Sequence, residues 1–271
     1  MTNSDPSVGD LLREWRQRRH LSQLGLASDA EISQRHLSFV ESGRSAPSRA
    51  MVLRLAEQLE IPLRERNALL VAAGFAPVYP NRPLDDPGME AARDAIGLIL
   101  QGHEPNPALA IDRHWTLVSA NRAVAHLLAG VDADLLQPPV NVLRLSLHPR
   151  GLAPRIGNYR EWRAHVIGRL ARQVDNSADP VLTGLLAELK ALPVPPGARP
   201  CRPRGDRAFG GVAVHLDLAT EHGTLSFIST TTIFGTALEI SLSEIAIESF
   251  FPADRVTAMA MRQLNEGDVS A

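Results

Sequence analysis

A run of polar side chains after Ser33 could form hydrogen bonds with the bases of nucleic acid. Gln34 and Arg35 are residue types that form paired hydrogen bonds with the edges of adenine and guanine, respectively. His36 and Ser38 add donors and acceptors within the next turn. Each such pair of bonds discriminates against a wrong base by about 1–3 kcal/mol. We therefore expect these side chains to contact base edges in the major groove of double-stranded DNA.

Residues on either side of this run are suited to hold phosphates. Ser22 and Gln23 stand where a helix is expected to begin, and a helix N-terminus presents free N–H groups and partial positive charge. Arg44 adds a cation after the run. Phosphate contacts orient a protein on DNA without specifying the sequence. The predicted DNA-binding residues are Ser22, Gln23, Ser33, Gln34, Arg35, His36, Ser38 and Arg44.

Helices must position both the side chains expected to contact bases and those expected to contact phosphates. Apolar residues recur at helical spacing in five segments, at about 8–19, 23–30, 34–42, 49–59 and 63–73. Ser22, Ser33 and Ser48 precede such segments, where a hydroxyl accepts a free backbone N–H. Gly43 and Gly74 follow the third and fifth segments, where a left-handed residue commonly ends a helix. The pattern predicts an all-α, five-helix domain whose second and third helices are joined by a short turn.

Residues 8–75 resemble the DNA-binding domain of Cro and lambda repressor, called the Xre family. The resemblance is carried by Leu21-Ser22-Gln23, Ala27, Ile32-Ser33, Leu37, Val40-Glu41-Ser42-Gly43-Arg44 and Pro47. It implies a helix-turn-helix whose second helix enters the major groove. The chain departs from the family at Glu31, a turn position that is usually glycine, so we expect a strained or altered turn there. The alternative is a helical hairpin with an arbitrary polar face.

The overall charge is nearly balanced, with 28 Lys and Arg residues against 30 Asp and Glu residues. Residues 1–80 contain ten Arg and nine acidic residues, whereas 81–271 contain 18 basic and 21 acidic residues. DNA-binding domains are usually basic, so the first part carries only a weak electrostatic signal. The basic residues are almost all Arg, and we draw no function from that ratio.

Two proline-dense stretches divide the chain, at 77–87 and 193–203. Neither can be a helix interior or a central strand. Because helical spacing alone precedes the first stretch and mixed spacing follows it, we predict a helix-turn-helix domain at 1–76, a linker at 77–89 and a second domain at 90–265. The second stretch is expected to be a loop inside that second domain.

The second domain shows both strand and helix patterns. Strands are predicted at 108–112 and 115–120, helices at 122–129, 162–170 and 182–189, and a hairpin at 212–218 and 224–234. The end, 238–251, is ambiguous: Ser241-Leu242-Ser243-Glu244 fits a capping box, yet Leu238, Ile240 and Leu242 alternate as in a strand. We favour a helix after Ser241. The order predicts an α+β domain with one antiparallel sheet and helices on one side.

Residues 90–262 resemble the ligand-binding domain of MmyB-like transcription regulators. The matching residues are Ala110-Ile111-Asp112-Arg113-His114-Trp115, Asn121-Arg122-Ala123, Asn141-Val142-Leu143-Arg144-Leu145, His148-Pro149, Glu161-Trp162-Arg163-Ala164 and Leu225-Ser226-Phe227. The resemblance implies a PAS-like fold with an apolar cavity for a fatty-acid-like or other small hydrophobic ligand. The chain departs from the family after Leu192, where a proline loop replaces an aromatic-containing helix, so the lining of the cavity does not transfer.

The candidate ligand-binding residues are aromatic side chains and polar side chains that could line such a cavity. They are Trp115, Asn121, Arg144, Arg155, Trp162, Arg163 and Phe227. Arg144 or Arg155 could hold a carboxylate with two parallel hydrogen bonds. The alternative is a structural role, because tryptophans usually lie in the core and arginines at the surface.

Other functions lack a signal. The sequence contains no nucleophile elbow, zinc-protease motif, phosphate loop or dinucleotide fingerprint, and its histidines are scattered, so no catalytic residue, metal or cofactor is predicted. Cys201 is the single cysteine, which argues against a disulfide. The longest apolar stretch, 68–78, is too short to span a membrane, and the N-terminus lacks the pattern of a signal peptide. We expect a cytoplasmic protein.

Together these features predict a transcription regulator. In the favoured hypothesis it binds a palindromic operator as a homodimer, and a small apolar ligand in the second domain changes its DNA affinity. In the second hypothesis, that domain serves only dimerisation or protein interaction. A third is an enzyme tethered to DNA.

Overall fold

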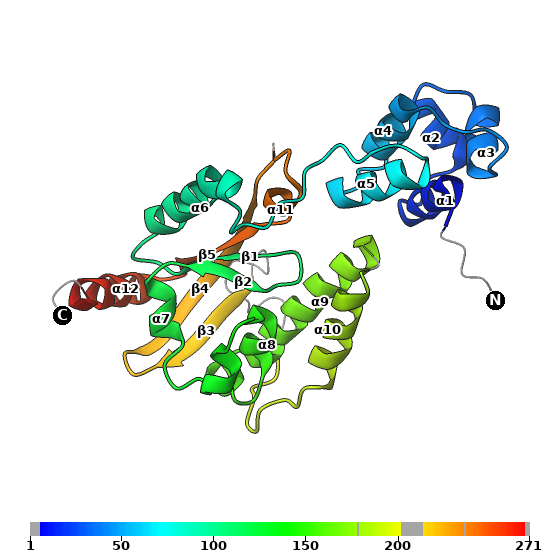
Figure 1. Cartoon of the computed structure of the whole chain (residues 1–271). Coiled ribbons are helices and arrows are strands. Elements are labelled where there is room, and N and C mark those ends of the chain that lie inside the picture. The colour runs from blue at the N-terminus through cyan, green and yellow to red at the C-terminus, as the bar shows by residue number, and fades with distance from the viewer. Residues whose placement is uncertain (1–5, 178, 202–213, 236, 269–271) are drawn as a thin grey trace. The chain divides into compact units, whose positions relative to one another are not determined.

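The computed structural model describes residues 6–177, 179–201, 214–235 and 237–268 (Figure 1). Within these ranges the chain forms two compact units, and each is described here by itself. The first consists of residues up to 83 together with 237–243, and the second of 84–235 and 244–268. The chain therefore passes between the units at three points along its length.

The first unit begins with five helices that confirm the predicted all-α domain. They are α1 (Val8–Arg18), α2 (Gln23–Asp29), α3 (Gln34–Glu41), α4 (Arg49–Gln58) and α5 (Leu63–Ala72). The three predicted serine caps are confirmed, since each hydroxyl accepts a backbone N–H three residues later. Gly43 and Gly74 have positive φ angles of 73° and 81°, as a helix-ending residue requires. The core is almost entirely aliphatic, with Leu12, Leu26, Leu37, Leu55, Leu69 and Leu70 fully buried.

The helices α1 and α3 approach each other closely. A Cβ atom at Gly9 would lie only 2.5 Å from the carbonyl oxygen of Val40, so this position accepts no larger residue without a backbone shift. The turn between α2 and α3 contains Glu31 at a φ of 54°, a left-handed conformation that costs a non-glycine residue free energy. The expected left-handed backbone at Glu31 is therefore present.

A buried carboxylate ties three of these helices together. The Glu41 side chain is 0% exposed and accepts hydrogen bonds from Arg16 Nε and Nη2 at 2.7 and 2.9 Å and from Gln23 Nε2 at 2.9 Å. Burial alone would raise the pKa of the Glu41 carboxyl, but the hydrogen bonds from Arg16 and Gln23 hold that pKa below its usual range. Glu41 therefore stays charged and fixes α3 against α1 and the start of α2.

The predicted linker, 77–89, is partly ordered against the first unit. Asn67 Oδ1 accepts the backbone N–H groups of Val78 and Tyr79, and its Nδ2 donates to the carbonyl of Tyr79. The backbone N–H of Ile240, in the short helix α11 (Ile240–Ser243), donates to the carbonyl of Pro80. The first unit thus includes part of the predicted linker together with a segment that is distant in sequence.

The second unit is built on a five-stranded antiparallel sheet, which confirms the predicted α+β class. Its strands are β1 (Ala108–Ile111), β2 (Leu117–Ala120), β3 (His215–Thr220), β4 (Gly223–Ile233) and β5 (Ala246–Pro252), in the order β2-β1-β5-β4-β3. The hairpin was predicted to include residues 212 and 213, which lie outside the described ranges.

Helices and short 3-10 turns fill the rest of the second unit. They are η1 (Pro87–Met89), α6 (Glu90–Gly102), α7 (Ala123–Leu127), η2 (Ala133–Leu136), α8 (Val142–Leu147), η3 (Ala153–Arg155), α9 (Tyr159–Ser177), α10 (Pro180–Ala191) and α12 (Arg255–Asp268). Figure 1 shows α8, α9 and α10 on one side of the sheet and α6 on the other, so the expectation that the helices share one side was wrong.

The end of the chain also differs from the expectation of a helix after Ser241. The helix α11 has only four residues, and the central strand β5 follows it. Ser241 does not cap a helix, because its hydroxyl hydrogen-bonds to the backbone carbonyl of Arg82. Strand β5 is paired on both edges, with β1 and β4, and both of its faces are largely buried. Such a strand lacks the alternation that marks a half-exposed one.

We predict that Glu41→Gln destabilises the first unit by about 3 kcal/mol at neutral pH, because Arg16 then lacks its buried counter-charge. The lowered pKa of Glu41 means that its contribution is present above the unfolded pKa and is lost as pH falls through the folded pKa. Urea unfolding of the variant should therefore depend less on pH below about pH 4 than that of the wild type.

Glu14→Gln is the matched control, since the Glu14 side chain is half exposed and its pair with Arg18 is worth less than about 1 kcal/mol. Equal stability of the Glu41 and Glu14 variants would show that the buried network is not needed.

Candidate functional site

The first candidate surface is the exposed side of α3. Leu37 and Val40 are buried against the other helices of the unit, which turns Gln34 and Arg35 toward solvent. His36 is half buried. The structure thus brings the residues predicted to contact bases onto the first five positions of one helix, an arrangement that fits a major groove.

An aromatic ring supports two arginines of this surface. The guanidinium carbon of Arg35 lies 5.3 Å from the centre of the Phe39 ring, and that of Arg44 lies 6.0 Å from it. Both distances fit a cation–π interaction, which restricts where these long side chains can point. Sequence reasoning missed Phe39, although its position four residues after Arg35 places it on the neighbouring turn of the same helix.

Three of the residues predicted to contact DNA, Ser22, Gln23 and Ser33, have hydrogen-bond partners within the chain. The hydroxyls of Ser22 and Ser33 accept the N–H groups of Gly25 and His36, and each hydroxyl proton can still donate. Gln23 donates to Glu41, so its position is set by the buried network. Ser38 lies half buried on α3, and Arg44 is exposed just beyond that helix.

The second candidate site is a pocket of about 310 Å³ inside the second unit, which we call the apolar pocket. It lies between the sheet and the helices α7, α8 and α9. Its aliphatic and aromatic lining is Leu109, Trp115, Leu117, Val124, Leu127, Leu128, Leu136, Val140, Val142, Leu143, Leu145, Leu152, Trp162, Val166, Leu216 and Phe250. Such a lining with a few polar groups is typical of a small-molecule site.

The polar lining of the apolar pocket comes mainly from α9 and strands β4 and β5. Thr231 lies opposite Glu248 in the sheet, and Ser229 lies opposite Phe250, so these four side chains share one face. Arg169 reaches from α9 to Glu248 in an ion pair with an N–O distance of 2.6 Å. The Arg169 guanidinium also lies 4.5 Å from the Trp115 ring centre.

His165 lies one turn before Arg169 and also lines the apolar pocket, where its ring stacks on Trp162 at 5.6 Å. Burial lowers the pKa of His165, and the positive charges of Arg169 and Arg172 lower it further. Its imidazole is therefore uncharged at neutral pH. Sequence reasoning did not single out His165 or Arg169, although both follow Trp162 at helical spacing on α9.

The predicted ligand-binding residues separate into two groups. Trp115 and Trp162 line the apolar pocket, with their indole N–H groups bonded to Gln173 and Ser146. Phe227 is fully buried and contacts Phe250 edge-on at 6.3 Å, so it backs the pocket without lining it.

Four polar candidates lie outside the lining because each has other partners. Asn121 is buried and bonds to the backbone of Leu100, Asn106 and Ala108. Arg144 pairs with Glu188, Arg155 donates to the carbonyls of Leu127, Ala129 and Ala219, and Arg163 donates to that of Lys190. These contacts fix loops and helices around the sheet, and they leave no guanidinium of this group directed at the apolar pocket.

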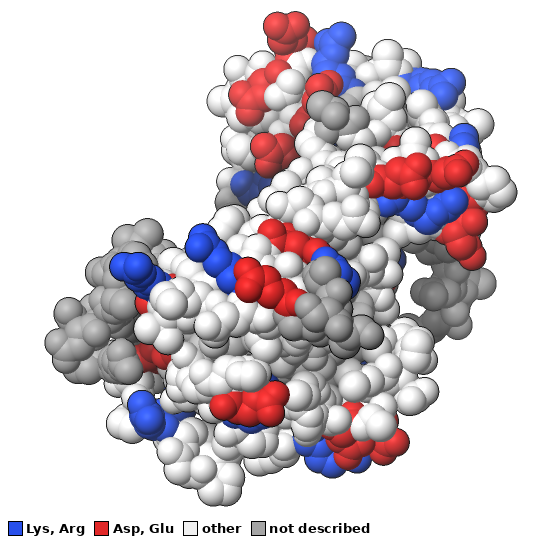
Figure 2. All heavy atoms as spheres, turned by 90° about the vertical axis from the view of Figure 1, so that its left-hand side faces the viewer, with Lys and Arg blue, Asp and Glu red and all other residues white. Residues whose placement is uncertain are grey.

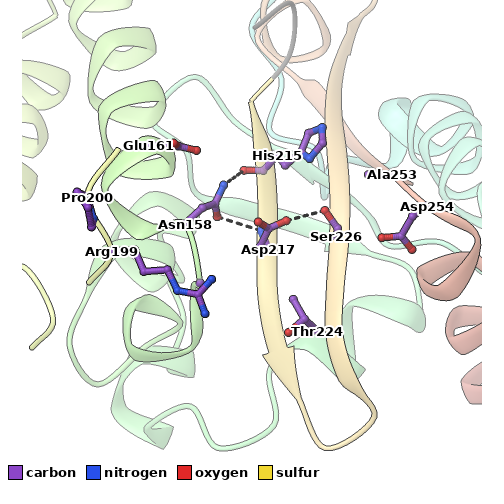
Figure 3. A pocket seen from close by; sticks show the side chains of 11 residues that line it. Asn158, Glu161, Arg199, Pro200, His215, Asp217, Thr224, Ser226, Ala253 and Asp254 are labelled. Atoms are coloured by element: carbon purple, nitrogen blue, oxygen red, sulfur yellow. Dashed lines mark hydrogen bonds between the residues drawn. The ribbon is translucent and has the colours of Figure 1, made fainter. Parts of the chain in front are cut away.

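A second, polar pocket of about 530 Å³ lies beside the β3–β4 hairpin (Figure 3). Asn158 bonds to the backbone of His215 and Asp217, and the Ser226 hydroxyl donates to Asp217 at 2.6 Å. Figure 3 shows these side chains directed at one another across the strands. These bonds hold the start of α9 against the edge strand β3, which gives the polar groups a structural role.

Three further observations concern the described ranges as a whole. Within them, no group of three His, Cys, Asp or Glu side chains is placed to hold a metal ion. Basic and acidic side chains are interspersed on the face that Figure 2 shows, without a large region of one sign. Among the described helices, none is both long and apolar enough to cross a membrane.

Two family models match the chain. The model of the MmyB-like transcription regulator ligand binding domain covers residues 92–264, and a helix-turn-helix model covers residues 12–66. No protein of curated function matches the sequence.

Solved structures give a more distant likeness. The PAS domain of BvgS from Bordetella pertussis is 17% identical with a TM-score of 0.28, and the match covers 67% of this chain and 100% of that chain. An RNA-binding light-oxygen-voltage receptor is 14% identical with a TM-score of 0.29, and the match covers 97% of this chain but only 63% of that chain. TM-scores this low carry no argument about function. On the family models, the chain belongs to the MmyB-like transcription regulators, with a helix-turn-helix DNA-binding domain ahead of its ligand-binding domain.

Proposed function

We propose that the exposed residues of α3 contact base edges in the major groove and that the apolar pocket binds a small hydrophobic ligand that changes DNA affinity. The observation that carries the first part is the joint exposure of Gln34 and Arg35 on a helix whose other side is fixed by Leu37, Val40 and Glu41. A rigid helix is needed because a paired hydrogen bond to a base tolerates little displacement.

The apolar pocket supports the second part of the proposal. Its lining offers many aliphatic contacts and few polar ones, so it suits an apolar chain, fatty-acid-like in shape. Binding at one site can change affinity at another only if both ligands favour the same conformation, and the effect must be reciprocal.

The connectivity offers a route for such coupling. Strands β4 and β5 supply Ser229, Glu248 and Phe250 to the apolar pocket, and the connection between these strands includes α11, which belongs to the first unit. A displacement of β4 and β5 together, as a hydrogen-bonded pair, would act directly on that connection. This covalent path requires no side-chain contact between the units.

Further parts of the proposal concern assembly and location. A homodimer on a palindromic operator would place two α3 helices in successive major grooves, as other helix-turn-helix proteins do. The protein would act in the cytoplasm, where it meets DNA, and would catalyse no reaction. If the second domain instead serves only dimerisation, the apolar pocket stays empty when the protein is purified.

We predict that Arg35→Ala weakens binding to the specific operator by about 1–3 kcal/mol while changing binding to unrelated DNA much less. The reason is that a bond to a base edge is lost rather than a phosphate contact. Arg262→Ala, which removes an exposed arginine on α12, is the matched control and should leave both affinities unchanged. Titration of labelled operator and unrelated duplexes measures the effect. Unchanged operator affinity in the Arg35 variant would exclude this side chain from base recognition.

Native mass spectrometry of the gently purified protein should show a bound small molecule. Val124→Phe, which fills part of the apolar pocket, should reduce the fraction that carries it, whereas Val181→Phe on the exposed side of α10 should not. A wild-type dimer without added mass would favour the dimerisation hypothesis instead.

A further inference from the structure

The charges that line the apolar pocket neutralise each other. Arg169 Nη1 and Nη2 donate to the two carboxylate oxygens of Glu248 at 3.0 and 2.6 Å. The Thr231 hydroxyl donates to the same carboxylate at 2.8 Å. The Glu248 side chain is only 7% exposed, so solvent does little to weaken this ion pair. Both carboxylate oxygens are therefore occupied by groups of the chain itself.

No other full charge belongs to the described lining of the apolar pocket. His165 is uncharged at neutral pH because burial lowers its pKa. The remaining polar lining residues are Ser146 and Ser229, and Ser146 already accepts the indole N–H of Trp162 at 2.8 Å. The pocket thus provides hydrogen-bonding groups but no uncompensated cation.

Because Arg169 and Glu248 neutralise each other, they restrict the charge that the polar group of a ligand can carry. A ligand carboxylate beside Arg169 would also lie beside Glu248, and it would lose its hydration without gaining a free counter-charge. A hydroxyl or ester group needs only hydrogen bonds, which Ser229 and His165 can supply. We infer that the apolar pocket selects an uncharged ligand with one polar end over a carboxylate of the same size. This inference rests on the proposed function of the pocket.

The volume of the pocket sets the size of the probes. At about 30 Å³ for each non-hydrogen atom, the share of one water molecule in the liquid, a pocket of about 310 Å³ holds about ten such atoms. Methyl octanoate and nonanoic acid are close to this size. The two are isomers and therefore have the same number of atoms. One is an uncharged ester, and the other is a carboxylic acid that is ionised at neutral pH.

The test is calorimetric titration of both probes into the full-length wild-type protein at about pH 7.5, where the acid is ionised, after removal of any co-purified ligand. We expect methyl octanoate to bind at least about tenfold more tightly than nonanoate. Glu248→Gln leaves Arg169 with an uncompensated charge and should shift the ratio of the two affinities toward nonanoate by about tenfold or more. Glu188→Gln, which removes the partner of Arg144 outside the pocket, should leave the ratio unchanged.

Each outcome has a separate meaning. Nonanoate binding as tightly as the ester to the wild type, or an unchanged ratio in Glu248→Gln, overturns the inference and leaves the proposed function standing. If neither probe binds the wild type, the proposed ligand function fails and the inference fails with it. Should Glu248→Gln not fold, the double variant Arg169→Gln/Glu248→Gln, which has no net change in charge, must keep the preference for the ester. Its loss would overturn the inference.

Discussion

The buried charge of Glu41 is the constraint on which the surface proposed to face DNA depends. A carboxylate with no exposure to solvent is stable only when its oxygens are bonded, and Arg16 and Gln23 supply those bonds from α1 and α2. The position of α3 is fixed as a consequence, because Glu41 is its last residue. Helix α3 can therefore present Gln34 and Arg35 in one orientation, which is what discrimination between bases requires.

A second buried ion pair, in the other unit, has a different consequence. Arg169 and Glu248 are 79 residues apart in sequence and meet at the wall of the apolar pocket. The Glu41 network fixes the exposed surface of α3. The Arg169–Glu248 pair instead sets the charge of the wall of the apolar pocket. The strand that carries Glu248 is also continuous with the segment that joins the first unit. The ion pair at the pocket wall and the connection to the first unit thus belong to the same part of the sheet.

Local signals predicted the first unit well, and long-range pairing explains what was missed in the second. Ser22, Ser33 and Ser48 cap helices through bonds to residues three positions away, so their effect is visible in a short window of sequence. Strand β5 was not predicted because its neighbours β1 and β4 bury both of its faces. The arginine candidates failed to mark the pocket for a similar reason, since the carboxylate or carbonyl partners of Arg144 and Arg155 lie far along the chain.

Selection of bound sequences from random DNA by the full-length protein tests the central claim most directly, because it measures base preference at every position. The wild type should enrich a symmetric site whose half-sites lie about one helical turn apart. Gln34→Lys should change the preferred base from adenine toward guanine at one position of each half-site and leave the others intact. No enriched sequence, or the same sequence for both proteins, would contradict the assignment of α3 to base recognition.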